Sequence, residues 1–142
     1  MDDRSAEIFD ELKKLDVLMG KRANALFSDA DISFSQAGVL KLLASRRGSD
    51  TSNRQIEEHF GISNPAASGL VKRLVEKDLV ESQVDQYDKR FRNVRITREG
   101  LELSQRMHGR VEQLNGRMLE GFSKEEEQEA LRLIRKMHDN LL

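Results

Sequence analysis

The stretch that decides the fold is Ser63-Asn64-Pro65-Ala66-Ala67-Ser68-Gly69-Leu70-Val71-Lys72-Arg73-Leu74. Its pattern predicts a helix. Ser63 suits the N-cap because its hydroxyl can accept from the free backbone N–H groups of the first turn. Pro65 lies where a missing N–H costs nothing. Apolar residues recur at helical spacing and predict a buried stripe made of Ala67, Leu70 and Leu74, supported by Val71.

The other face of this helix is small, polar and basic. Small residues let a backbone approach closely, and polar residues can hydrogen bond with base edges or phosphates. We therefore expect this face to meet a large anionic partner. It carries Asn64, Ala66, Ser68, Gly69, Lys72 and Arg73.

The preceding segment predicts a second, shorter helix. Ser52 and Gln55 have capping-box spacing, and Gly61 stands where a left-handed C-terminal cap is wanted. Two helices joined at Gly61 form either a helix-turn-helix, whose second helix enters the major groove, or an ordinary helical hairpin of a bundle. These residues alone leave both alternatives open.

The following segment favours the helix-turn-helix because it predicts a β-hairpin. A strand-like run extends to Asp85, a turn follows over 86–90, and a second strand is expected over 91–97. Residues 49–51 are expected to add a short strand. A solvated edge strand has no reason to choose one sign of charge, whereas a hairpin that straddles phosphates does. Between positions 89 and 98 every charged residue is basic: Lys89, Arg90, Arg92, Arg95 and Arg98.

Together these segments resemble the MarR family of winged helix-turn-helix transcriptional regulators. The family's recognition helix opens with Ser, a polar residue and Pro, as at 63–65, and continues into a Leu-Val-x-x-Leu run, as at 70–74. Its wing carries Asp-x-Arg, then Val and Leu-Thr-x-x-Gly, matched by 88–90, Val94 and 96–100. Two positions depart from the pattern. Asp78 replaces the usual Gly after the recognition helix, and Glu57 replaces a small residue.

The resemblance implies a mainly α fold with a small β-hairpin wing in a single domain over 1–142. The winged helix-turn-helix, DNA-binding region is expected over 33–98, with dimerisation helices over 1–29 and 101–142. The implied function is sequence-specific binding of double-stranded DNA by a transcriptional regulator, with repression the commoner behaviour. In the family, the arginine matching Arg90 reaches the minor groove or its phosphates, oriented by the aspartate matching Asp88.

Composition excludes several other classes of protein. The chain has 142 residues, 35% of them charged, and no cysteine. We expect neither a disulfide nor a thiol switch. Without an apolar run near 18 residues or a cleavable signal, we expect a soluble, cytoplasmic protein with no membrane partner. The net charge of −1 is the sum of unlike parts: the 1–16 and 120–129 segments are acidic, whereas the wing is basic.

The flanking segments predict long amphipathic helices: one over about 3–27, one from Thr97 to about 120, and a last one after a capping box at Ser123. Their apolar stripes exceed what one winged helix can cover, so we expect a homodimer. Twofold symmetry places two recognition helices about 34 Å apart on a pseudo-palindromic operator.

We assign the DNA contacts from side-chain chemistry. Asn64 and Ser68 are expected at base edges, since Asn can pair with adenine. Ser63, Ala66 and Asp88 complete the expected surface. The phosphate contacts are expected from Lys72, Arg73, Arg90, Arg92 and Arg95, with Arg90 also a candidate for the minor groove.

The resemblance also implies control by a small amphipathic effector, often an aromatic or phenolic acid, bound in a crevice between the dimerisation helices and the winged domain. Core or surface packing explains the candidate lining residues equally well. They are Met19, Arg22, Phe34, Met107 and Arg110.

Other classes of function have less support. No nucleophile motif or phosphate-binding glycine loop is present, so we expect no enzyme and no cofactor. His108 and Glu112 lie four apart on a predicted helix and form either an ordinary polar pair or half of a metal-sensing site. We assign no metal site. A winged-helix module that binds protein would expose an apolar recognition face, which Asn64 and Lys72 argue against.

Overall fold

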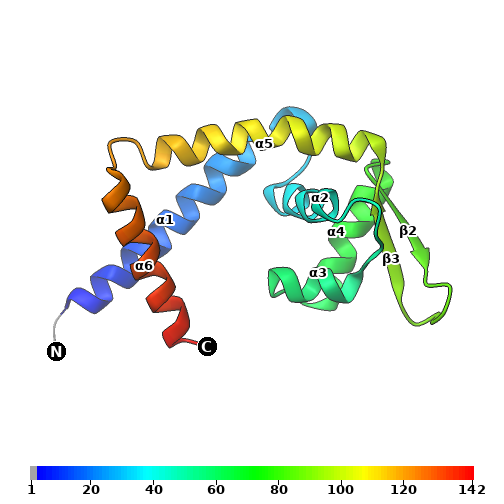
Figure 1. The fold of residues 1–142 in the computed structure, drawn as a ribbon, viewed down its shortest axis with the longest axis horizontal. Helices are drawn as coiled ribbons and strands as arrows, with labels where there is room; N and C mark the ends of the chain where they lie inside the picture. Colours follow the sequence, from blue (N-terminus) through cyan, green and yellow to red (C-terminus); the bar gives the residue numbers. More distant parts are fainter. Residues whose placement is uncertain (1–2) are drawn as a thin grey trace.

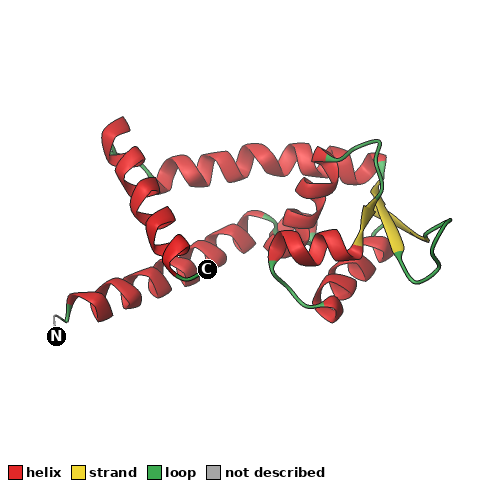
Figure 2. Cartoon of the chain, turned by 60° about the horizontal axis from the view of Figure 1, so that its bottom comes forward, coloured by secondary structure: helices red, strands yellow, loops and turns green. Residues whose placement is uncertain are grey.

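The computed structural model describes residues 3–142. They form a mainly helical fold with one small antiparallel sheet (Figures 1 and 2), which confirms the predicted fold class. The elements are α1 (Arg4–Leu26), the short 3-10 helix η1 (Ser28–Ala30), α2 (Phe34–Ser45), β1 (Thr51–Ser52), α3 (Asn53–Phe60), α4 (Asn64–Glu76), β2 (Val80–Val84), β3 (Arg92–Ile96), α5 (Arg98–Met118) and α6 (Lys124–Asn140).

The sheet is a hairpin with one short strand added. Strands β2 and β3 pair antiparallel with Ser82 opposite Val94, and β1 pairs antiparallel with the other edge of β3. Val94 is therefore central, and its side chain is fully buried. The predicted hairpin and the predicted short strand are both confirmed, the latter at 51–52 rather than 49–51.

Side chains cap most of the helices. Ser52 and Ser123 accept from the backbone N–H groups of Gln55 and Glu126 in the capping boxes that the sequence predicts. A third capping box joins Ser33 to Gln36 at the start of α2. Each cap satisfies backbone donors that the first turn leaves free. The helix boundaries consequently lie within about two residues of the predicted ones.

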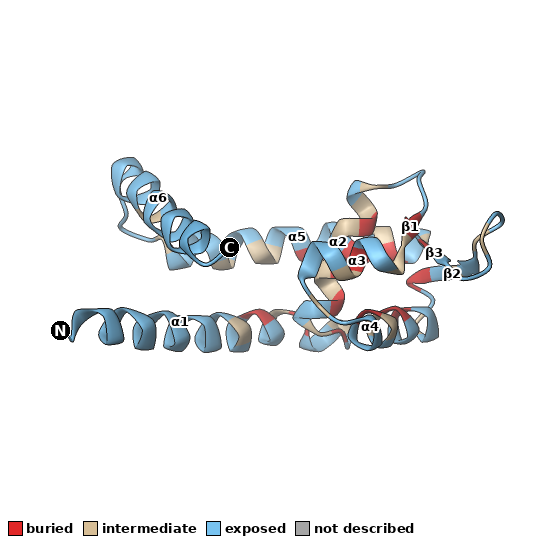
Figure 3. Cartoon of the chain, turned by 90° about the horizontal axis from the view of Figure 1, so that it is seen from below, coloured by how far each residue is buried: buried red, intermediate tan, exposed pale blue. Residues whose placement is uncertain are grey.

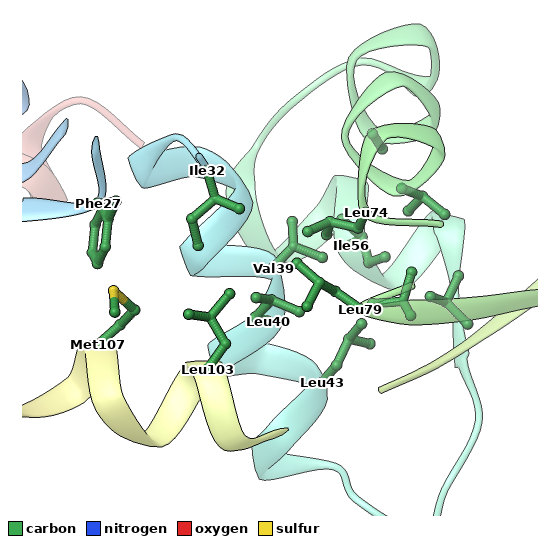
Figure 4. Close-up of a cluster of buried hydrophobic side chains, with 14 residues drawn as sticks. Phe27, Ile32, Val39, Leu40, Leu43, Ile56, Leu74, Leu79, Leu103 and Met107 are labelled. Atoms are coloured by element: carbon green, nitrogen blue, oxygen red, sulfur yellow. The ribbon is translucent and has the colours of Figure 1, made fainter. Parts of the chain in front are cut away.

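The core lies where α2, α4, the sheet and the first half of α5 meet (Figure 4). Leu40 of α2 and Ile56 of α3 are fully buried, as is Leu74 of α4. Phe27, after the end of α1, and Met107 of α5 lie at the opposite end of the same cluster. This core holds the two helices of the helix-turn-helix and the base of the hairpin as one packed unit.

The remaining elements project from this unit as an arm made of α1, the second half of α5 and α6 (Figures 1 and 3). Ala23 is the one buried residue among those of α1, and none of the described residues of α6 is buried. Large apolar side chains are nonetheless present there, including Phe9, Leu12, Ile134 and Met137, all exposed. No helix within residues 3–142 combines the length and the apolar character needed to span a membrane.

Two ion pairs tie the arm to the packed unit through η1. The guanidinium of Arg110 in α5 donates to both carboxylate oxygens of Asp29, at 2.7 and 3.0 Å, and to the carbonyl of Leu26 at 2.9 Å. Nζ of Lys77, just after α4, lies 3.8 Å from Oδ2 of Asp31 and donates to the carbonyl oxygen of the same residue. These contacts join the segment around η1 to both α5 and the end of α4.

Candidate nucleic-acid interface

Helix α4 presents the surface that its sequence predicts. Ala67, Val71 and Leu74 are buried, while Leu70 is only half-buried, so Val71 takes a larger share of the packing than expected. Pro65 lies in the first turn, and the Ser63 hydroxyl accepts from the backbone N–H of Ala66. Ser68 is half-buried. The residues exposed on the outer face are Ser63, Asn64, Ala66, Gly69, Lys72 and Arg73.

Two polar side chains of α4 are held by residues of α3. The Nδ2 group of Asn64 donates to Oε2 of Glu57 at 3.3 Å. The Nδ2 group of Asn53 donates to the Ser68 hydroxyl oxygen at 3.4 Å, and Oδ1 of Asn53 is buried without a hydrogen-bond partner among the described residues. Sequence reasoning did not assign Asn53 to the site, because its role depends on how α3 packs across α4.

The wing carries an arginine fixed by its neighbour. Asp88 accepts from Nε and Nη2 of Arg90 at 3.0 and 2.8 Å, and from the backbone N–H of Arg90 at 3.0 Å. These hydrogen bonds hold the pKa of the Asp88 carboxyl below its ordinary value of 3.8. The guanidinium also lies 5.9 Å from the centre of the Phe91 ring. Arg90 thus extends from the hairpin turn as an oriented, solvent-exposed cation.

The other two wing arginines point to opposite faces of β3. Val94 and Ile96 face the core, so Arg92 lies on their side of the strand, beyond the core. Arg95 lies on the opposite side, where it faces Glu81 across the sheet and pairs with the Asp50 carboxylate. Arg92 is therefore more available to phosphates than Arg95, whose charge is already partnered.

The five candidate effector residues do not all line one cavity. Met19, Arg22 and Phe34 line a cavity of about 410 Å³ between α1 and α5. Phe34 and Met107 border a second cavity of about 720 Å³ between α2 and α5. Met107 belongs to the core, and Arg110 is bound to Asp29 and borders neither of these cavities among the described residues.

His108 and Glu112 form a simple polar pair on α5. Their Nε2 and Oε1 atoms are 3.0 Å apart, and both side chains are exposed. Across residues 3–142, no group of three histidine, aspartate or glutamate side chains is arranged to hold a metal ion. A contact of this kind is what the i,i+4 spacing allows.

A family model described as MarR family matches residues 30–90. A curated relative, the uncharacterised HTH-type transcriptional regulator YwaE of Bacillus subtilis (strain 168), is 31% identical over 88 residues, covering 62% of this chain and 52% of the relative. The matched part of the chain therefore spans about half the length of that relative. The match includes the helix-turn-helix region, where the interface residues of α3 and α4 lie.

Solved structures share the fold over nearly the whole chain. The MepR–DNA complex of S. aureus matches with a TM-score of 0.85 and 22% identity, covering 92% of this chain and 95% of that one. A MarR-like transcription regulator from Bacillus cereus ATCC 10987 matches with a TM-score of 0.87 and 21% identity, covering 99% and 100%. A MarR protein from Peptoclostridium difficile matches with a TM-score of 0.86 and 17% identity, covering 94% and 86%.

Proposed function

We propose that this chain is a MarR-family transcriptional regulator that binds double-stranded DNA in a sequence-specific manner. The observation that carries the proposal is the pairing of a polar, basic helix face on α4 with an oriented arginine on the adjacent wing. A helix of this kind fits the major groove, and a cation on a hairpin beside it fits the minor groove or its phosphates. The shared fold of the MepR–DNA complex supports this assignment.

The protein acts as a homodimer on a pseudo-palindromic operator. Support comes from the arm, whose exposed apolar side chains on α1 and α6 have no cover within the described chain. A second copy of the chain would bury these side chains, because a twofold interface pairs the same surface of both copies. The dimer repeats α4 and the wing, so each half of the operator meets one copy.

The proposed regulator is a repressor that a small aromatic or phenolic acid releases from DNA. The apolar cavity bordered by Met19 and Phe34 supports this control, since Arg22 and Arg117 at its edge suit a carboxylate. Binding there changes DNA affinity only if the effector favours one spacing of the two recognition helices over another. By contrast, the exposed face of α4 is polar and basic, which gives a protein-binding module or a catalytic site no support.

The test is in vitro selection from a library of random duplexes, followed by fluorescence anisotropy with the enriched duplex across a salt series. We expect a pseudo-palindromic sequence, preferred over unrelated DNA by about 10³-fold or more, with affinity that falls as salt rises. Arg90→Ala should weaken binding. Arg132→Ala on α6 removes the same charge away from the wing and should leave binding unchanged.

Enrichment of no sequence, with equal binding to every duplex, would contradict a specific regulator. Absence of binding even at low salt would remove the DNA-binding proposal altogether.

A further inference from the structure

We propose that Glu57 and Asn53 of α3 are positioning residues that set which bases the recognition helix selects. Each holds one polar side chain of α4 by a direct hydrogen bond. The inference rests on the proposed function, because base selection presupposes DNA binding. It goes beyond that function by assigning the polarity of two contacts, and hence the class of base that each one takes.

Glu57 fixes the orientation of the Asn64 amide. A carboxylate accepts hydrogen bonds and donates none. Its Oε2 atom, 3.3 Å from Nδ2, therefore holds the amino side of the amide and leaves the Asn64 oxygen as the free acceptor. The reverse orientation would set the amide oxygen against the carboxylate. Since Asn64 is exposed in the first turn of α4, this acceptor is available to a base edge.

The free acceptor selects bases that carry an amino group. In the major groove, adenine offers N6–H₂ and cytosine offers N4–H₂ as donors. Guanine presents only acceptors there, and thymine presents an acceptor and a methyl group. Asn64 held by Glu57 is thus expected to favour adenine or cytosine at its position.

Asn53 gives Ser68 the opposite polarity. Its Nδ2 group donates to the Ser68 hydroxyl oxygen at 3.4 Å, which leaves the hydroxyl hydrogen to be donated elsewhere. The base edges that accept are guanine O6 and N7, thymine O4 and adenine N7. The Oδ1 atom of Asn53 is buried without a partner among residues 3–142. A buried polar atom without a hydrogen bond is unfavourable, so packing alone gives no reason for an asparagine here.

The two contacts lie one helical turn apart on the same face. Asn64 and Ser68 are four residues apart, which corresponds to a rise of about 6 Å along α4. Base pairs stack about 3.4 Å apart. Each half-site should therefore present a donor to Asn64 and, about two steps away, an acceptor to Ser68.

The experiment is in vitro selection with the full-length protein and matched variants. Asn64→Ala and Ser68→Ala first identify the base position that each side chain reads. Glu57→Ala should then reduce the preference for adenine or cytosine at the Asn64 position by about three- to tenfold, the factor that one net hydrogen bond supplies. Glu57→Gln should keep that preference, because its amide oxygen still accepts from Asn64 although the charge is gone.

Asn53→Ala should relax selection at the Ser68 position alone. Thermal melting of each variant checks that the fold is intact, and Arg54→Ala, a neighbouring exposed residue of α3 paired with Glu58, serves as the control.

The inference is overturned if Glu57→Ala leaves every base preference unchanged, or if Glu57→Gln relaxes the preference as much as Glu57→Ala does. The second result would assign the effect to charge rather than to orientation. A wild-type protein that selects a sequence while its α3 variants select the same one removes this inference only. A wild-type protein that selects no sequence removes the proposed function as well.

Discussion

The carboxylate of Asp88 fixes Arg90 by three hydrogen bonds: it accepts from Nε and Nη2 of the guanidinium and from the backbone N–H of Arg90. The side chain of Arg90 is 84% exposed and that of Asp88 is 31% exposed. Such an exposed pair adds little to stability. Its effect is to hold a flexible cation in one direction at the tip of the wing.

Removing the hydrogen bonds between Asp88 and Arg90 should weaken DNA binding without unfolding the protein. Asp88→Ala leaves the charge of Arg90 in place but frees its side chain, so binding must then order it. We expect affinity to fall about threefold to tenfold, close to the cost of immobilising one long side chain. Anisotropy with the selected duplex measures the loss. Arg90→Lys should bind no better than Asp88→Ala, because an ammonium cannot make the two parallel hydrogen bonds.

Gly100 is required by a close backbone contact at the base of the wing. A Cβ atom at this position would lie 2.1 Å from the carbonyl oxygen of Leu79, so the two backbones would have to separate. We expect Gly100→Ala to reduce the free energy of unfolding by about 2 kcal/mol or more. Urea denaturation measures it. Gly109→Ala, in the same helix with nothing within 4 Å, should instead stabilise by about 0.5–1 kcal/mol.

Asp78 occupies the left-handed position after the recognition helix that the family usually gives to glycine. Its φ is +57°, and its carbonyl accepts from the Thr97 hydroxyl at 2.8 Å. Asp78→Gly keeps that carbonyl and removes the strain of a side chain in this conformation, so we expect a gain of about 1 kcal/mol in the free energy of unfolding. Asp78→Ala keeps the strain and should show no gain. A melt in which both variants gain equally would contradict this reasoning.

Local sequence patterns predicted most of the fold. Ser52 with Gln55, and Ser123 with Glu126, mark helix starts because the capping side chain lies only three residues from its partner. The same holds for α4, where Ser63 and Pro65 fix the start of the helix. In each case the physical cause lies within one helical turn and is visible in the sequence.

Contacts between distant segments could not be predicted in this way. The run of basic residues over 89–98 predicted Arg95 as a phosphate contact. The strand register, however, places Glu81 opposite Arg95, and Asp50, directly before β1, pairs with it. Likewise, Asn53 reaches Ser68 only because α3 packs across α4. Such pairs depend on tertiary geometry that no local spacing encodes.

The exposed apolar face of α6 should hold the homodimer together. Ile134 is 54% exposed in the single chain, so Ile134→Glu has little effect on the fold of one copy but places a charge where a partner would pack. We expect the variant to sediment as a monomer at concentrations where the wild type is a dimer. Gln128→Glu adds the same charge without removing apolar surface and should stay dimeric. A dimeric Ile134→Glu would place the interface elsewhere.

The Arg110–Asp29 pair should make stability depend on pH in the acid range only. Hydrogen bonds from Arg110 hold the pKa of Asp29 below its ordinary value of 3.8. A depressed carboxyl pKa contributes stability that is present above the unfolded pKa and is lost as pH falls through the folded one. The melting temperatures of the wild type and Arg110→Met should therefore differ at pH 5–7 and converge below about pH 4. Arg106→Met, at an exposed position of the same helix, controls for lost charge. If the difference in melting temperature between the wild type and Arg110→Met stayed constant down to pH 2.5, Arg110 would act through the Leu26 carbonyl rather than through Asp29.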